Sequence, residues 1–288
     1  MKKKTRRWIA AIAAAAALSL LGWALVWGNT ALVMADVLVC SNGIPEAFDA
    51  YKIVQISDLH DAQIGENNEK LIAMTAETEP DCIVLTGDFV DSSRFHPERS
   101  LSVAEALVKI APVYYVSGNH EAILPDEDYQ ALTDGLRALG VCVLEDESAE
   151  LTRGGQSIRL IGLTDIGFHP GTLEEKKDAL RTALNALLPE DEFSVTLAHR
   201  PELMDVYTEC GAPLVLSGHA HGGQIRLPGI GGLIAPGQGL FPKYTEGKYE
   251  ENGTTLVVSR GVGNSVLPLR VNDRPQIVVV QLACNYRM

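Results

Sequence analysis

The sequence predicts an α/β fold built around a largely parallel sheet, and three observations support this prediction. Short β-branched runs alternate with amphipathic stretches from Tyr51 onward, each run ends in a polar cluster, and prolines and glycines stand where helices should begin and end. Such a βαβαβα rhythm is typical of parallel strands covered by helices. The chain of 288 residues, 46% of them hydrophobic, is long enough to bury a sizeable core.

The first half of the chain reads as three strand–helix pairs. Buried strands are expected at residues 52–57, 82–86 and 113–117, because each is a short apolar run without alternation. The helices are expected at residues 68–78, 97–110 and 126–139. Pro97 is well placed to begin the second helix, and Gly140 to end the third.

The second half has a less regular pattern. A hairpin is expected over residues 150–163, turning at Gly154-Gly155. Helices at 173–188 and 201–209 then alternate with strands at 193–198 and 213–217. Three further strands, at 224–227, 254–259 and 276–282, have no helix between them and predict a second sheet with antiparallel character. Residues 222–239 are rich in glycine and proline and predict a long functional loop.

The N-terminal segment, residues 1–30, differs from the rest. Five basic residues precede residues 8–28, an uncharged run rich in alanine and leucine with tryptophans near both ends. At about 1.5 Å per residue, a helix of this length spans the roughly 30 Å hydrocarbon core. We therefore expect a single-pass anchor in the cell membrane, with a cytoplasmic N-terminus and an extracytoplasmic catalytic domain. A cleaved signal peptide is the alternative.

The remaining chain divides into a linker or edge segment at 31–44 and a single catalytic domain at 45–288. After the basic cluster it carries 19 basic against 37 acidic side chains, a formal charge of −18. Such a body repels polyphosphate backbones, so a nucleic-acid polymer is not expected as a partner. The five cysteines are odd in number and widely spaced, which predicts buried free thiols rather than a disulfide framework.

Metal-binding side chains recur directly after the predicted strands. They are Asp58, His60, Asp88, Asn119, His199, His219 and His221. Each alone has an ordinary structural explanation as a turn former or a core histidine. Five of the seven histidines, however, follow strands, and ligands collect at the carboxyl ends of strands in open α/β sheets. The joint pattern therefore predicts a metal site, from which His96 and His169 are left out.

These residues lie in five motifs that resemble those of the calcineurin-like metallophosphoesterases, in the same order. The motifs are Asp58-x-His60, Gly87-Asp88-x-x-Asp91, Gly118-Asn119-His120-Glu121, His199 and Gly218-His219-x-His221. The resemblance covers about residues 52–282 and implies a four-layer α/β/β/α sandwich of two mixed sheets. Residues 197–203, 218–227 and 239–247 look like a membrane-anchored bacterial branch that includes UDP-2,3-diacylglucosamine pyrophosphatases.

The resemblance also implies a role for each site residue. Asp58, His60, Asp88 and His221 would hold a first metal ion, and Asp88 would bridge to a second. Asn119, His199 and His219 would complete the second site, and His120 would act on the phosphoryl group as an acid or charge stabiliser. Mixed imidazole, carboxylate and amide ligands suit two divalent ions of Mn, Fe, Zn or Ni. A bridging hydroxide between the ions would attack in line.

The expected enzyme is a metal-dependent phosphoric ester hydrolase. It would cleave a phosphodiester, phosphomonoester or pyrophosphate of a phosphorylated small molecule or lipid, including a UDP-sugar lipid. The alternatives are a cyclic-nucleotide or small-nucleotide phosphodiesterase and a catalytically silent scaffold. Arg270, Arg226 and Lys243 are the candidate contacts for the substrate phosphate, and Arg200 and Arg260 lie near the same C-terminal loops.

Overall fold

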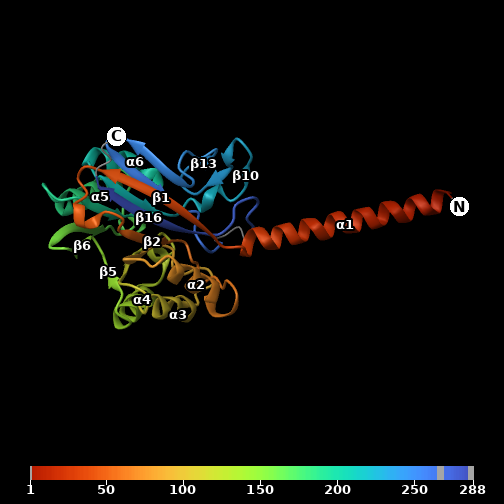
Figure 1. Cartoon of the computed structure of the whole chain (residues 1–288), viewed down its shortest axis with the longest axis horizontal. Helices are drawn as coiled ribbons and strands as arrows, with labels where there is room; N and C mark the ends of the chain where they lie inside the picture. Colours follow the sequence, from red (N-terminus) through yellow and green to blue (C-terminus); the bar gives the residue numbers. More distant parts are fainter. Residues whose placement is uncertain (1, 265–268, 285–288) are drawn as a thin grey trace.

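The computed structural model describes residues 2–264 and 269–284, and it confirms an α/β fold with two mixed sheets (Figure 1). The first sheet contains, in spatial order, β1 (Val33–Ser41), β16 (Gln276–Cys284), β2 (Lys52–Ile56), β3 (Cys82–Thr86), β4 (Val113–Val116) and β5 (Cys142–Val143). The second contains β14 (Gly247–Glu251), β15 (Thr254–Val258), β9 (Leu214–Ser217), β8 (Ser194–Leu197), β7 (Gln156–Gly162) and β6 (Glu147–Arg153).

Both sheets have a parallel centre. Strands β2 to β5 run parallel, whereas β16 is antiparallel to β2 and parallel to β1. In the second sheet β15, β9, β8 and β7 run parallel, and the two edge strands β14 and β6 are antiparallel to their neighbours. Parallel neighbours end at the same edge of a sheet, so the segments that follow them gather there.

Helices cover the outer face of each sheet, which gives four layers. The first sheet is covered by α2 (Glu69–Glu77), α3 (Pro97–Leu107) and α4 (Asp126–Ala138), and the second by α5 (Leu173–Leu187) and α6 (Met204–Cys210) (Figure 1). Leu107 and Leu136 pack with Val54 of β2 in one outer core, and Leu184 and Tyr207 belong to the other.

A third apolar layer lies between the two sheets. Ile53 of β2 and Val84 of β3 are fully buried there with Val195 of β8 and Leu216 of β9. Their sequence neighbours point to the outer cores, so these strands are buried on both faces. This double burial explains why they read as unbroken apolar runs in the sequence.

The strand membership expected for the end of the chain is wrong. The three strands at 224–227, 254–259 and 276–282 do not form a sheet of their own. The second is β15, which lies beside β9, and the third is β16, which lies between β1 and β2. The first is only β10 (Arg226–Leu227), paired with β11 (Gly231–Gly232). Because β16 is apolar on both faces, a central position buries it better than an exposed antiparallel ribbon would.

The loop expected at 222–239 contains short hairpins rather than irregular chain alone. Beside the β10–β11 pair, β12 (Ile234–Ala235) pairs with β13 (Gly239–Leu240). All five cysteines are free thiols, as expected, but Cys40 and Cys142 are exposed and not buried. In these strands the side chains alternate between core and solvent, and the apolar composition of the strands gave no sign of which face is exposed.

The N-terminal helix α1 (Lys2–Thr30) extends away from the body of the molecule (Figure 1). The expectation of a transmembrane anchor at residues 8–28 is not supported, since no helix in the described part of the chain is long and apolar enough to cross a bilayer. The segment at 31–44, expected as a linker or edge, holds strand β1, which pairs in parallel with β16 over nine residues.

Candidate metal centre

The candidate site lies where the ends of five strands from both sheets meet. Asp58 and His60 follow β2, Asp88 follows β3, and Asn119 follows β4. From the second sheet, His199 follows β8, and His219 and His221 follow β9. All seven predicted ligands therefore come together, and all except the half-buried Asn119 are buried. The two sheets contribute to one site because their parallel centres end on the same side.

Four of these side chains form a first donor group, Asp58, His60, Asp88 and His221, whose ligand atoms lie within 4.8 Å of one another. Nε2 of His60 lies 3.2 Å from Nε2 of His221 and 3.6 Å from Oδ2 of Asp88. Nε2 of His221 lies 3.4 Å from Oδ1 of Asp58. Ligands about 2.1 Å from a shared ion are about 3.0–3.4 Å apart at octahedral or tetrahedral angles. The spacing fits a single ion.

A second donor group shares one atom with the first. Nε2 of His199 lies 3.2 Å from Oδ2 of Asp88, 3.2 Å from Oδ1 of Asn119 and 3.2 Å from Nδ1 of His219. Oδ1 of Asp88 accepts the backbone N–H of His120 at 2.8 Å, which leaves Oδ2 to face both groups. The same carboxylate oxygen is therefore common to the two clusters.

The charges of the site match the needs of divalent ions. Burial lowers the pKa of His60 to about 4 and holds those of His219 and His221 well below their usual value, so these imidazoles are neutral, the form that ligates metals. Burial raises the pKa of Asp58 to about 6, and the nearby Asp88 carboxylate adds to this effect. Two buried carboxylates require positive charge between them. The donor set therefore fits two divalent ions.

The pKa of His199 shifts upward, in the opposite direction to those of the other three histidines. Burial opposes its protonation, but the carboxylates of Asp88 and Asp58 outweigh burial and raise its pKa to about 10. Its Nδ1 lies 2.8 Å from the carbonyl oxygen of Thr86, so Nδ1–H donates there and Nε2 is directed at Asp88. A hydrogen bond of this kind fixes the tautomer in which Nε2 can ligate a metal.

The backbone at the site adopts an unusual conformation. Asp58, His60, Asp88, His219 and His221 all have positive φ, between 45° and 64°. For L-residues this left-handed region costs about 1–2 kcal/mol each, although Asp and His tolerate it better than most. Five strained positions among seven predicted ligands indicate that the fold, and not local preference, aims these side chains inward.

Two glycines allow the ligand loops to pack closely. A Cβ on Gly118 would run into the carboxylate of Asp88, and a Cβ on Gly218 would run into Ser57 and the carboxylate of Asp58. The glycine that opens each of the Gly-Asn and Gly-His motifs is therefore required, because a side chain there would meet a predicted metal ligand. That ligand is Asp88 after β3 of the same sheet for Gly118, and Asp58 after β2 of the other sheet for Gly218.

Glu121 supports the Asp88 loop, and sequence reasoning gave it no role. Its side chain is fully buried, and its Oε2 accepts the N–H of Asp88 at 2.9 Å and of Gly118 at 2.7 Å. Its Oε1 accepts the N–H of Phe89 at 2.7 Å and of Val90 at 3.2 Å. The position directly after Asn119-His120 was the available signal, because a carboxylate there can reach back to the preceding strand end.

Glu121→Gln is expected to lower the free energy of unfolding by roughly 2–5 kcal/mol at pH 8. The amide nitrogen cannot accept the two N–H groups that faced the lost oxygen, and each unsatisfied buried donor costs about 1–3 kcal/mol. Burial raises the pKa of Glu121 from its usual 4.5 to about 7, so ionisation costs the folded wild type stability between these values, and its advantage over the variant should grow as the pH is lowered from 8 to about 4.5.

Urea unfolding with EDTA present measures this effect without any contribution from metal affinity. The control is Glu105→Gln, an exposed residue that pairs with Lys109 on α3, and its effect should stay within about 0.5 kcal/mol. Equal unfolding midpoints for wild type and Glu121→Gln at pH 8 would contradict the supporting role.

His120 lies at the edge of the two donor groups. Its Nδ1 accepts the backbone N–H of Ser92 at 3.2 Å, and the Ser92 hydroxyl lies 3.0 Å from the same atom. Its ring packs edge-on against His60, with centroids 4.5 Å apart. A backbone N–H can only donate, so Nδ1 is the acceptor and the neutral ring carries its proton on Nε2.

The structure does not place Arg270 where a substrate could reach it. The side chain is 1% exposed, and its Nη2 donates to the carbonyl oxygens of Arg260 at 2.9 Å and Gly263 at 2.6 Å. Nη1 donates to Asp273 at 3.3 Å, and Nη2 lies 3.4 Å from Nδ1 of His221. Arg270 therefore supports the loop behind a predicted metal ligand.

The other proposed phosphate contacts are all paired with carboxylates. Arg226 and Arg260 both bind Glu246, and Lys243 binds Glu251. Arg200 binds Asp165 through two hydrogen bonds of 2.7 and 3.1 Å. The pocket that opens beside His60 is lined instead by Arg94, His96 and Arg99. These three lie in the six-residue segment 94–99, which follows the Gly87-Asp88-x-x-Asp91 motif, and that concentration of basic side chains was the missed signal.

The sequence pattern of the calcineurin-like phosphoesterases matches residues 51–223. The chain belongs to this family. It is 34% identical over 253 residues to the uncharacterized metallophosphoesterase YkuE of Bacillus subtilis, covering 84% of this chain and 82% of that one. It is 29% identical to the phosphodiesterase YaeI of Escherichia coli, covering 81% and 82%. The fold resembles TT1561 of Thermus thermophilus, with a TM-score of 0.51 at 15% identity, covering 74% of this chain and 90% of that one.

Membership of the family places the chain among the metal-dependent phosphoesterases. Calcineurin-like phosphoesterases use two divalent metal ions, and the two donor groups that share Asp88 could hold them. The narrower expectation, a membrane-anchored branch acting on UDP-diacylglucosamine, is not confirmed, because YkuE is named an uncharacterized metallophosphoesterase and YaeI a phosphodiesterase.

Proposed function

We propose that this protein hydrolyses phosphodiesters at a dimetal centre bridged by Asp88. One observation carries the proposal: Oδ2 of Asp88 lies 3.6 Å from Nε2 of His60 and 3.2 Å from Nε2 of His199, and so belongs to both donor groups. A carboxylate shared in this way offsets the repulsion between two neighbouring cations.

In this proposal seven side chains bind the metal ions and one, His120, donates a proton. Asp58, His60 and His221 hold one ion, Asn119, His199 and His219 hold the other, and Asp88 holds both. The bound ions supply Lewis-acid activation of water and of the phosphoryl group. His120 carries a proton on Nε2, since its Nδ1 is occupied by Ser92, and directs that proton toward the oxygen of the leaving group.

The name of the relative YaeI favours a phosphodiester over a phosphomonoester. Within that class a small nucleotide diester is the leading candidate, because the formal −18 body disfavours long nucleic acids but not small nucleotides. A UDP-sugar lipid is the second candidate, carried over from the resemblance to the UDP-2,3-diacylglucosamine pyrophosphatases.

Metal removal should abolish turnover, and metal return should restore it. The full chain is treated with EDTA, dialysed, and assayed on bis-p-nitrophenyl phosphate with Mn²⁺, Zn²⁺, Fe²⁺ or Ni²⁺ added back. Elemental analysis of the active form should give about two ions per chain. The absence of turnover with every metal would reject the proposed function.

A substrate panel then separates the two candidates. Cyclic nucleotides, p-nitrophenyl nucleotide esters and a UDP-sugar lipid in detergent are compared under the metal condition that gives the highest activity. A higher kcat/KM for the lipid than for every nucleotide would favour the second candidate over the first.

A further inference from the structure

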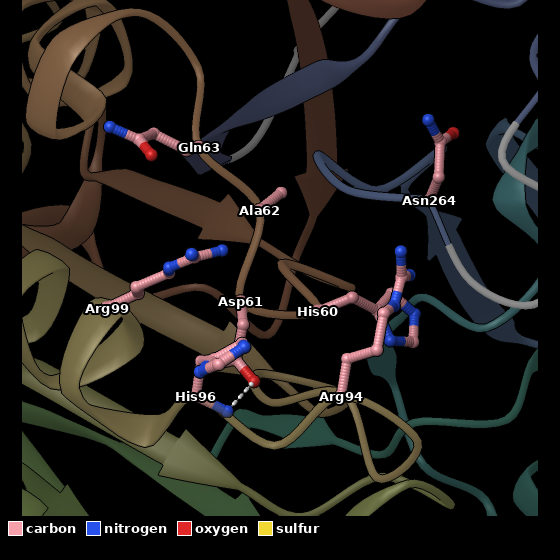
Figure 2. A pocket seen from close by; sticks show the side chains of 8 residues that line it. All are labelled: His60, Asp61, Ala62, Gln63, Arg94, His96, Arg99 and Asn264. Atoms are coloured by element: carbon pink, nitrogen blue, oxygen red, sulfur yellow. Dashed lines mark hydrogen bonds between the residues drawn. The ribbon is translucent and has the colours of Figure 1, made fainter.

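A polar groove leads away from the candidate metal centre. It begins as a pocket of about 280 Å³ lined by His60, Gln63, Arg94, His96, Arg99 and Asn264 (Figure 2). A second pocket of about 340 Å³ adjoins it, since Gln63 and Arg99 line both, and continues to Asn67, Glu98 and Ser102. The lining is made almost entirely of polar side chains, with Ala62 as its apolar member.

The groove holds two arginines, Arg94 and Arg99, and two carboxylates, Asp61 and Glu98, so its recognition of an anion depends on which of these charges are already paired. The guanidinium of Arg94 binds Asp91 through hydrogen bonds of 3.1 and 2.7 Å, which hold it in the part of the groove nearest His60. Arg99 lies on the opposite side of Asp61 from His60 in Figure 2. Across residues 2–264 and 269–284, no carboxylate forms an ion pair with Arg99.

Both carboxylates of the groove are engaged by groups other than Arg99: Glu98 lies 3.3 Å from Nδ1 of His96, and Asp61 accepts hydrogen bonds inside the protein. Asp61 is 3% exposed, and its Oδ2 accepts the backbone N–H groups of Asp91 and His96, both at 3.0 Å. Its Oδ1 accepts the hydroxyl of Ser100 at 2.7 Å. Both oxygens are thus occupied inside the protein, and Arg99 remains available to an anion that enters the groove.

We propose that this groove binds a second anionic group of the substrate, a phosphate or carboxylate on a hydrophilic substituent of the scissile phosphodiester, and that Arg99 recognises it. The inference rests on the proposed function and narrows its substrate class. Arg94 lines the pocket together with His60, whereas Arg99 also lines the adjoining pocket, which His60 does not reach. A guanidinium binds phosphate and carboxylate oxygens in a two-pronged, charge-assisted geometry.

The test compares two substrates that differ by one phosphate. They are the p-nitrophenyl ester of thymidine 5′-phosphate and the same ester with an added 3′-phosphate. For the wild-type holoenzyme, the 3′-phosphate should lower KM about tenfold with kcat nearly unchanged, the effect of one charge-assisted contact at a partly solvated site. Arg99→Gln should remove this advantage and leave kcat/KM for the simpler ester within about twofold.

Arg153→Gln is the matched control. Arg153 is a partly exposed arginine at the end of β6, and its loss changes the net charge by the same amount as the loss of Arg99. It should keep the tenfold preference, which separates local recognition from long-range attraction. Thymidine 3′,5′-bisphosphate should likewise inhibit wild type about tenfold better than thymidine 5′-phosphate, but not Arg99→Gln.

The outcomes distinguish this inference from the proposed function. No turnover of either ester or of bis-p-nitrophenyl phosphate rejects the proposed function. Turnover of both esters with equal KM, or an equal loss on both in Arg99→Gln, rejects the groove assignment alone. Hydrolysis of bis-p-nitrophenyl phosphate but of neither thymidine ester also rejects the groove assignment, because a groove for hydrophilic substituents should admit at least one of these esters.

Discussion

Asp88→Ala is expected to lose both metal ions and to reduce turnover by more than about four orders of magnitude. Oδ2 of Asp88 is the one atom that belongs to both donor groups, so its removal leaves each ion with an incomplete set of ligands. Two-metal sites activate water by shifting its pKa from 15.7 to about 7, and this activation is lost with the ions. Elemental analysis after dialysis and an assay of bis-p-nitrophenyl phosphate hydrolysis measure the two effects.

The fold of the variant should survive this change. The secondary structure rests on the three apolar cores, to which Asp88 does not belong, although its removal leaves the buried His199 without the carboxylate 3.2 Å away. A native far-UV circular dichroism spectrum is therefore expected. Asp205→Asn, a surface change on α6, should keep both ions and full activity. Retention of both ions by Asp88→Ala would disprove the bridging assignment.

His120→Ala is expected to lower kcat by about 10²–10⁴-fold while both ions stay bound. His120 follows Asn119 and contacts the donor groups through its ring edge and its backbone, but it belongs to neither group, so it is not needed to hold metal. Its Nδ1 is held by Ser92, and an acid that acts through Nε2 should matter most when the leaving oxygen needs a proton.

The choice of leaving group separates the two roles open to His120. If His120 protonates the leaving oxygen, the variant should lose far more activity on an alkyl phosphodiester than on a p-nitrophenyl one, because p-nitrophenolate departs without a proton. An equal loss on both esters would instead indicate stabilisation of charge on the phosphoryl group. Loss of metal from His120→Ala would contradict both roles.

The sequence predicted the buried strands and the candidate ligands that follow them, because both are marked by short local patterns of residues. Strands such as Cys82–Thr86 are short apolar runs buried on both faces, and their type and bounds follow from that burial. The seven candidate ligands could be found because each stands directly after such a strand. Their convergence followed from the rule that parallel strands end at one edge.

The rest depended on information that no local window contains. The partners of β16 are decided by packing between segments more than two hundred residues apart, so its place in the first sheet was missed. Arg270 carries the charge expected of a phosphate contact, yet its burial behind His221 is a property of the folded loops. Arg99 belongs to a cluster of basic residues at 94–99 that is visible in the sequence, but only the fold places this cluster beside His60.

The position of β16 has a consequence for biosynthesis. At about 5–20 residues per second, ribosomes need on the order of 10–50 s to travel from the end of β1 to the start of β16. During that interval β1 and β2 each lack the neighbour that later separates them. The nascent polypeptide therefore exposes strand edges whose backbone N–H and C=O groups have no hydrogen-bond partner. Maturation of this sheet is therefore largely post-translational, and newly made chains should depend on chaperones that shield such edges.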